Sequence, residues 1–397
     1  MRKRFAFFMI AVIALAVFGG CGGRTCVPPT AAPAIGQKWL DPSKIKEMKT
    51  HSGKSLREVI KVAVSAAQPD LPEILILSGG GQNGAFGAGF LNGLAQRTGS
   101  QYDLNFDIVT GISTGALQAT FAFLGPDYYA MLEAFYLNLS LGDIFVPRFF
   151  LSLLWSDSIV DSAPLRALLE NTITLDMIEE VAQAHEDGRR LFIGTLDLDQ
   201  GGLVVWDMGE IAQGRNQQAL EKYHEILMAA TAVPVLLPPV EIDYTLSSGE
   251  LYKGLHVDGG LRENLFFRHF MLDLGESVSA NARLFVIVNG KIGLGYSCID
   301  AHWVPIAERT INASLDETTF NGVLRTYLIA CSNNMEFKLM RIPDDVEMEV
   351  YGYTFDSALM QMLIEKGKEL GLLEPVPWEE NPPFADDFVD ICTKLQN

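Results

Sequence analysis

Clustered positive charge is nearly absent from this sequence. The 397 residues contain 30 Lys and Arg against 49 Asp and Glu, a formal net charge of −19. The one basic tract, Arg2-Lys3-Arg4, lies at the very start. Nucleic-acid binding depends on clustered Lys and Arg side chains that neutralise phosphates. The composition therefore argues against a nucleic-acid partner.

Cysteine is also scarce. The five cysteines form no C-x-x-C pair, and none lies near a histidine at the spacing of metal ligands. This pattern disfavours a structural zinc site, and we expect no metal and no other cofactor. Cys26 could pair with Cys298, Cys331 or Cys392, and the sequence does not choose among them.

The apolar run near the start is too short to cross a membrane comfortably. It covers residues 5–18 and follows the basic tract, as in a signal peptide. Gly19 and Gly20 then precede Cys21, an arrangement that resembles a bacterial lipoprotein signal, in which this cysteine is lipidated after cleavage. The alternatives are an ordinary secretory signal or a short membrane anchor.

We therefore expect residues 1–20 to be a lipoprotein signal peptide and Cys21 to carry acyl chains such as palmitate. The protein would then be extracytoplasmic and anchored to a bacterial membrane, in the outer membrane or at the cell surface if the cell is Gram-negative. Residues 21–53 are rich in Gly and Pro at their start and follow no helix or strand period, so we expect a tether.

Residues 54–397 alternate apolar runs of strand length with helical patterns. Hydrophobic residues make up 48% and charged residues 20%, a balance typical of a globular chain. The alternation predicts an α/β fold with a mainly parallel central sheet flanked by helices, in which ligands bind beyond the carboxyl ends of the strands. We expect strands at 73–77, 106–110, 191–196, 254–257 and 284–288, and helices at 85–97, 115–124 and 162–171.

The second of these strands runs into Gly111-Ile112-Ser113-Thr114-Gly115, directly before a predicted helix. A G-x-S-x-G sequence between a strand and a helix is typical of a nucleophile elbow, with small neighbours that permit the tight turn. The helix dipole would favour negative charge near the Ser113 hydroxyl. The alternative is that Ser113 only caps the helix.

The first strand runs into Ser78-Gly79-Gly80-Gly81-Gln82-Asn83-Gly84. Consecutive glycines leave backbone N–H groups unobstructed, as an oxyanion hole for acyl transfer requires. The same stretch fits G-x-G-x-x-G, a dinucleotide-binding pattern. That pattern requires an acidic residue at the end of the second strand, whereas Asp103 precedes the strand that leads to Ser113, so we favour the oxyanion hole.

A serine nucleophile needs a base within reach. None of the six histidines lies in a recognisable triad context, although a Ser-Asp-His order would admit His269 or His302. Asp258 follows a short apolar run and precedes Gly259 and Gly260, so we expect its carboxylate at the same edge of the sheet. Its pKa, ordinarily about 3.9, would have to be raised by burial or by contact with the serine.

Three segments in this order resemble the patatin-like phospholipase family: residues 78–84, 111–115 and 258–260. The small residues and proline at 229–234 and the downstream Asn264 add to the resemblance, which covers about residues 73–270. It implies a three-layer α/β fold, and residues 271–397 are expected to complete the same domain.

The resemblance implies a Ser113–Asp258 dyad without histidine that hydrolyses lipid acyl esters, commonly phospholipids or lysophospholipids, through an acyl-enzyme. It also assigns the oxyanion hole to Gly79, Gly80 and Gly81. The glycines that support these segments are Gly84, Gly111, Gly115, Gly259 and Gly260.

Two features leave other functions open. Many family members have Asp or Gly at the position of Ser78 and a basic residue at that of Asn83. The alternatives are therefore a catalytically silent lipoprotein that binds lipid or a protein partner, and a Ser-His-Asp esterase. A separate apolar run covers residues 145–155. It is either part of the core or a lid that faces the membrane. The preferred head group, the acyl position and the oligomeric state stay open.

Overall fold

The computed structural model describes residues 72–97, 104–139, 146–147, 160–234, 236–245, 251–267, 282–293, 295–348 and 355–385. The expected signal peptide, Cys21, the tether, His269 and nearly all of the apolar run at residues 145–155 lie outside these ranges. Within them, no helix has the length and apolar character needed to cross a membrane.

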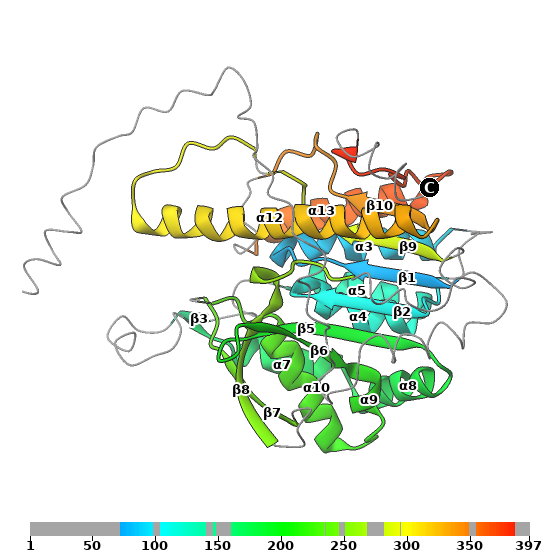
Figure 1. Ribbon diagram of the computed structural model, residues 1–397, viewed down its shortest axis with the longest axis vertical. Coiled ribbons are helices and arrows are strands. Elements are labelled where there is room, and N and C mark those ends of the chain that lie inside the picture. The colour runs from blue at the N-terminus through cyan, green and yellow to red at the C-terminus, as the bar shows by residue number, and fades with distance from the viewer. Residues whose placement is uncertain are drawn as a thin grey trace, which may run out of the picture.

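The core of the molecule is one mixed sheet of eight strands (Figure 1). Its main path has the order β10-β9-β1-β2-β5-β8-β7, and β6 pairs with β5. The five strands from β10 to β5 are parallel, whereas β6, β7 and β8 pair in antiparallel fashion. The strands are β1 (Glu73–Leu77), β2 (Ile108–Ile112), β5 (Arg190–Asp197), β6 (Gly202–Asp207), β7 (Val240–Thr245), β8 (Leu251–Asp258), β9 (Arg283–Val288) and β10 (Glu336–Arg341).

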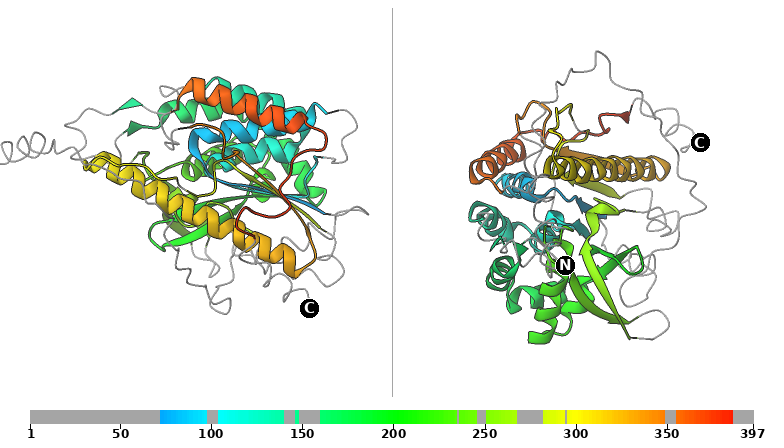
Figure 2. Two further views of the ribbon diagram at one scale, coloured as in Figure 1. Left: turned by 90° about the horizontal axis from the view of Figure 1, so that it is seen from above. Right: turned by 90° about the vertical axis from the view of Figure 1, so that its left-hand side faces the viewer.

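Helices cover both faces of the sheet, so the predicted three-layer α/β class is confirmed (Figure 2). One face carries α3 (Gly84–Ala95), α4 (Thr114–Leu124), α5 (Tyr129–Leu137), α7 (Ala163–Thr172), α8 (Leu175–Glu186), α9 (Met208–Ala212), α10 (Gln217–Ala230) and α13 (Ser357–Leu372). The other face carries the long α12 (Trp303–Ser332). A small second sheet pairs β3 (Val146–Pro147) with β4 (Val160–Asp161), and single 3-10 turns are η2 (Gly81–Asn83), η3 (Pro126–Tyr128) and η5 (Gly259–Leu261).

Side chains that alternate along β1 contribute to two apolar clusters, one on each face of the sheet. Leu75 and Leu77 belong to the apolar cluster under α3 and α4, whereas Ile74 and Ile76 belong to the cluster under α12. Successive side chains of a strand point to opposite faces, so a strand that is covered on both sides must be apolar throughout. That is why an uninterrupted apolar run marks β1 in the sequence.

The described residues beyond 271 are built into the same layers. Strand β9 lies between β1 and β10, and α13 packs on α3. The two helices approach closely because glycines face backbone across the contact: a Cβ on Gly89 would lie 2.1 Å from the Ile364 carbonyl oxygen, and one on Gly367 would lie 2.2 Å from that of Phe86. This close packing fixes the N-terminal end of α13 relative to α3.

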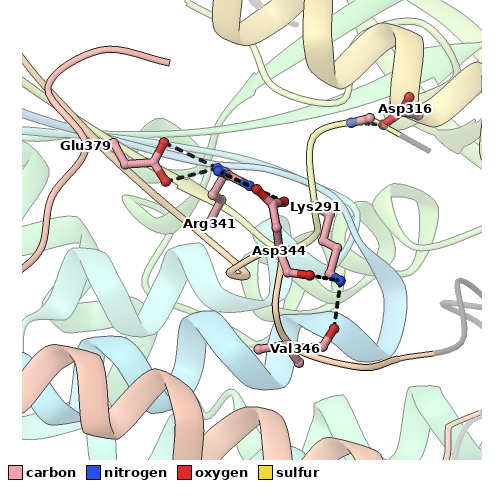
Figure 3. Close-up of polar contacts among 7 residues, drawn as sticks. Lys291, Asp316, Arg341, Asp344, Val346 and Glu379 are labelled. Atoms are coloured by element: carbon pink, nitrogen blue, oxygen red, sulfur yellow. Dashed lines mark hydrogen bonds and ion pairs between the residues drawn. The ribbon is translucent and has the colours of Figure 1, made fainter. Parts of the chain in front are cut away.

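A charged cluster joins the loops that follow β9 and β10 (Figure 3). Lys291 Nζ donates to the backbone oxygens of Asp344 (2.9 Å) and Val346 (2.7 Å). Arg341, nearly buried, pairs with Asp344 (2.6 Å) and Glu379 (3.0 Å), and its hydrogen bonds lower the pKa of Asp344. The cluster therefore braces this edge of the sheet.

Candidate active site

The turn between β2 and α4 holds Ser113 in a strained conformation. Its φ is 54° and its ψ is −125°, in the region of backbone space that residues other than glycine rarely adopt. The turn is tight because small residues meet there: a Cβ on Gly111 would lie 2.4 Å from the Gly115 oxygen, and one on Gly115 would lie 2.4 Å from the Leu77 oxygen. This is the geometry of a nucleophile elbow.

The strand pairing around β5 brings Asp258 to this turn. Strand β2 pairs with β5 up to Ile112, which lies opposite Gly194. Along residues 192–197 the other side of β5 is occupied by β6, so β8 takes the side that β2 leaves. Asp258 at the end of β8 lies opposite Thr195, the residue after Gly194. Ser113 follows Ile112 directly, and the two side chains therefore meet.

The direction of β8 differs from the simplest form of the prediction. The expected position of Asp258, at the edge of the sheet where β1 and β2 end, is correct. However, β8 runs antiparallel to β5. The chain therefore comes from beyond the carboxyl ends of the parallel strands and reaches this edge at Asp258. Its side chain also accepts a hydrogen bond from the Gly260 N–H (2.7 Å), which fixes the turn into η5.

The Ser113 and Asp258 side chains lie close enough for the Ser113 hydroxyl to lower the pKa of Asp258 by hydrogen bonding. Both are largely buried, at 8% and 4% exposure. Burial raises the pKa of Asp258 from 3.8 to about 6, although the hydrogen bonds from Ser113 and Gly260 oppose the shift. A carboxyl group with a pKa near 6 is ionised at neutral pH, yet it is basic enough to accept a proton from a serine in the transition state.

The glycine loop lies beside the Ser113 side chain. A Cβ on Gly79 would lie 3.0 Å from the Ser113 Cβ. The Gly79 N–H donates to the backbone oxygen of Asn264 (2.9 Å), so it is not available to an oxyanion in this arrangement. Between described residues, no hydrogen bond uses the N–H of Gly80 or of Gly81. The prediction of three donors is therefore wrong for Gly79, whereas Gly80 and Gly81 keep the property that it requires.

Two buried amide side chains that our sequence analysis missed hold this loop in place. Asn289 donates from its backbone N–H to Ser78 Oγ (2.9 Å) and from Nδ2 to the Ser78 oxygen (2.8 Å). Asn289 Nδ2 also donates to Gln118 Oε1 (2.8 Å), and Gln118 Nε2 donates to the Gly84 oxygen (2.6 Å). Asn289 directly follows β9, so its place after an apolar strand was an available signal.

An apolar pocket opens beside Ser113. It holds about 550 Å³ of empty space, its open mouth included. Gly81, Ser113 and Thr114 line it, and its remaining walls are mostly aliphatic and aromatic. These are Leu117, Tyr136, Leu139, Leu165, Thr231, Val233, Leu236, Leu237 and Phe355. Such a pocket suits a hydrocarbon chain whose reacting end lies at Ser113.

Besides His185, whose Nδ1 lies 3.4 Å from Asp207 Oδ1, three described histidines occupy other positions. His302 is exposed at the start of α12. His256 is buried and hydrogen-bonds with Thr195 Oγ1 (2.9 Å), and burial lowers its pKa to about 4. His224 hydrogen-bonds with the Ile173 oxygen (2.9 Å). Because Ser113 contacts Asp258 directly, none of these three imidazoles lies between them as a triad would require.

The sequence of residues 75–271 matches the family described as patatin-like phospholipase. Residues 75–271 form a patatin-like phospholipase domain. Its bounds agree closely with the predicted 73–270, and it includes the glycine loop, the elbow and the Asp258 turn. This domain supports lipid acyl hydrolase activity in general. No curated protein matches the chain.

Proposed function

We propose that this protein is a serine acyl hydrolase that cleaves phospholipids or lysophospholipids through a Ser113–Asp258 dyad. The observation that carries the proposal is that Ser113, in the wall of an apolar pocket within a patatin-like domain, lies close enough to Asp258 to lower the pKa of that carboxyl by hydrogen bonding. The dyad requires no metal, since the base and the nucleophile are both protein side chains.

The geometry supports the following steps. Asp258 accepts the proton of the Ser113 hydroxyl as Oγ attacks the ester carbonyl. The N–H groups of Gly80 and Gly81, with the dipole of α4, stabilise the oxyanion that forms. Asp258 then gives the proton to the departing alcohol, which leaves the acyl group on Ser113. A water molecule, deprotonated by Asp258, attacks the acyl-enzyme; the bond between the acyl carbon and Ser113 Oγ breaks, Asp258 returns the proton to Oγ, and the fatty acid is released.

A fluorophosphonate probe tests the nucleophile. The probe bonds covalently to an activated serine oxygen as fluoride leaves. We expect mass spectrometry to place the label on Ser113 in the wild type and to find no label in Ser113→Ala. An unlabelled, folded wild-type protein would instead favour a silent lipoprotein that binds lipid or a partner.

We also propose that Cys21 carries the lipid anchor on the extracytoplasmic side of a bacterial membrane. Cys298 and Cys331 are both disulfide-bonded, a state typical of oxidising compartments. Cells fed an alkyne analogue of palmitate should label the wild type and not Cys21→Ser, as seen by click detection after gel separation. Equal labelling of the two proteins would contradict this assignment.

A further inference from the structure

One wall of the pocket comes from outside the patatin-like match. Of the lining residues that the structure describes, Phe355 is the only one beyond residue 271. Phe355 therefore lies outside the segment that matches the family. A side chain that this chain adds to the pocket is a candidate for selecting its substrate.

The backbone at Phe355 is strained. Its φ is 47°, in the left-handed region that favours glycine and that bulky residues rarely adopt. Strain of this kind persists only where the surrounding structure imposes it, and it is often found at ligand-binding sites. The aromatic ring is therefore held at the pocket despite an unfavourable backbone conformation.

Two contacts of the next residue fix the backbone at Phe355 beside the glycine loop. The N–H of the next residue, Asp356, donates to Gln82 Oε1 (2.8 Å), and Gln82 directly follows the pocket residue Gly81. Asp356 also caps α13 by accepting from the N–H of Ala358 (2.8 Å) and Leu359 (3.0 Å). Because α13 packs tightly on α3, the backbone that carries the Phe355 ring has a fixed position relative to the glycine loop.

We infer that Phe355 narrows the pocket beside Ser113 and so selects unbranched acyl groups over acyl groups branched next to the carbonyl. The inference rests on the proposed function, since it treats the pocket as the acyl site. In an apolar pocket, one extra or missing methylene changes kcat/KM by about 10- to 200-fold. Removing the ring creates space at that level of the pocket, and enlarging the ring takes space away.

Isomeric substrates separate shape from hydrophobicity. We expect Phe355→Ala and Phe355→Gly to raise the ratio of kcat/KM for p-nitrophenyl 2-propylpentanoate over p-nitrophenyl octanoate about 10-fold or more relative to wild type. Phe355→Trp should lower this ratio. The intrinsic reactivities of the two esters cancel in the comparison, and Phe355→Gly also suits the backbone φ, so loss of the ring is tested without loss of the local conformation.

Phe320→Ala is the matched control, because Phe320 is a partly buried ring that packs against Phe384 and is not among the pocket residues. It should leave the ratio unchanged. A ratio within twofold of wild type in both Phe355→Ala and Phe355→Gly, with melting temperatures retained, would overturn the inference.

A binding measurement keeps this test separate from that of the proposed function. In the Ser113→Ala background, the relative Kd of octanoic and 2-propylpentanoic acids, measured by displacement of a fluorescent fatty acid, should shift with Phe355→Gly in the same direction. If the wild type hydrolyses neither ester, the proposed function fails, and the binding ratio alone decides the role of Phe355. An unshifted binding ratio would then overturn it.

Discussion

Asp258→Asn is expected to lower kcat/KM for lipid ester hydrolysis by about 10³- to 10⁴-fold. Asn keeps the size of the side chain and its ability to accept from the Gly260 N–H, but it cannot take the proton of Ser113. The rate should be measured with a lysophospholipid by following released fatty acid. A loss of less than tenfold would show that another group is the base.

The raised pKa of Asp258 gives the same residue a signature in pH and in stability. Below a pH of about 6 the carboxyl of the free enzyme becomes protonated, so kcat/KM should fall as the pH decreases through that value.

Because the folded pKa lies above the unfolded value of 3.8, ionisation of Asp258 destabilises the folded state as the pH rises. Asp258→Asn should therefore melt no lower than wild type at pH 7, which excludes unfolding as the cause of lost activity.

Histidine variants distinguish the dyad from a Ser-His-Asp triad. His302→Ala should keep near-normal activity, since His302 is exposed at the start of α12. His269 lies outside the described residues, so His269→Ala is the more informative variant. Loss of activity in His269→Ala, with the fold retained, would assign the reaction to a triad, whereas the dyad predicts near-normal rates in both histidine variants.

Local signals in the sequence were sufficient to predict the core strands and the elbow. The apolar run of β1 is confirmed at residues 73–77. Strand β2 was predicted two residues too early, at 106–110, because Gly111 reads as the start of a turn. In the fold, partners on both sides extend the strand: Gly111 lies opposite Leu77, and Ile112 opposite Gly194.

Contacts between distant segments could not be predicted in the same way. The antiparallel direction of β8 depends on which side of β5 is left open after Ile112, and that is a property of the assembled sheet. Asn289 and Phe355 reach the site from segments well beyond the Asp258 turn. The place of Asn289 after an apolar strand marks it as a candidate, whereas Phe355 has no local pattern that distinguishes it from an ordinary loop residue, and only the fold reveals what each one contacts.

Gly80→Ala is expected to reduce kcat by about 10²- to 10³-fold, the usual cost of losing an oxyanion donor. A Cβ on Gly80 would lie 1.9 Å from the backbone oxygen of Asn289 and 2.8 Å from the Asn289 Cβ. Asn289 cannot move easily, because its backbone N–H and its side chain are both hydrogen-bonded to Ser78. The glycine loop must therefore shift instead, and its N–H groups would move away from the oxyanion.

Gly290→Ala provides the matched control, since a Cβ at this neighbouring position has no atom within 4 Å and the variant should keep wild-type kcat. The KM of Gly80→Ala should change little, because the apolar walls of the pocket bind the acyl chain equally in the ground state and in the transition state. A raised KM with an unchanged kcat would mean that the loop positions the substrate and does not stabilise the oxyanion. If Gly80→Ala loses kcat and keeps its KM, while Gly290→Ala keeps the wild-type kcat, the N–H groups of this loop must act where negative charge develops.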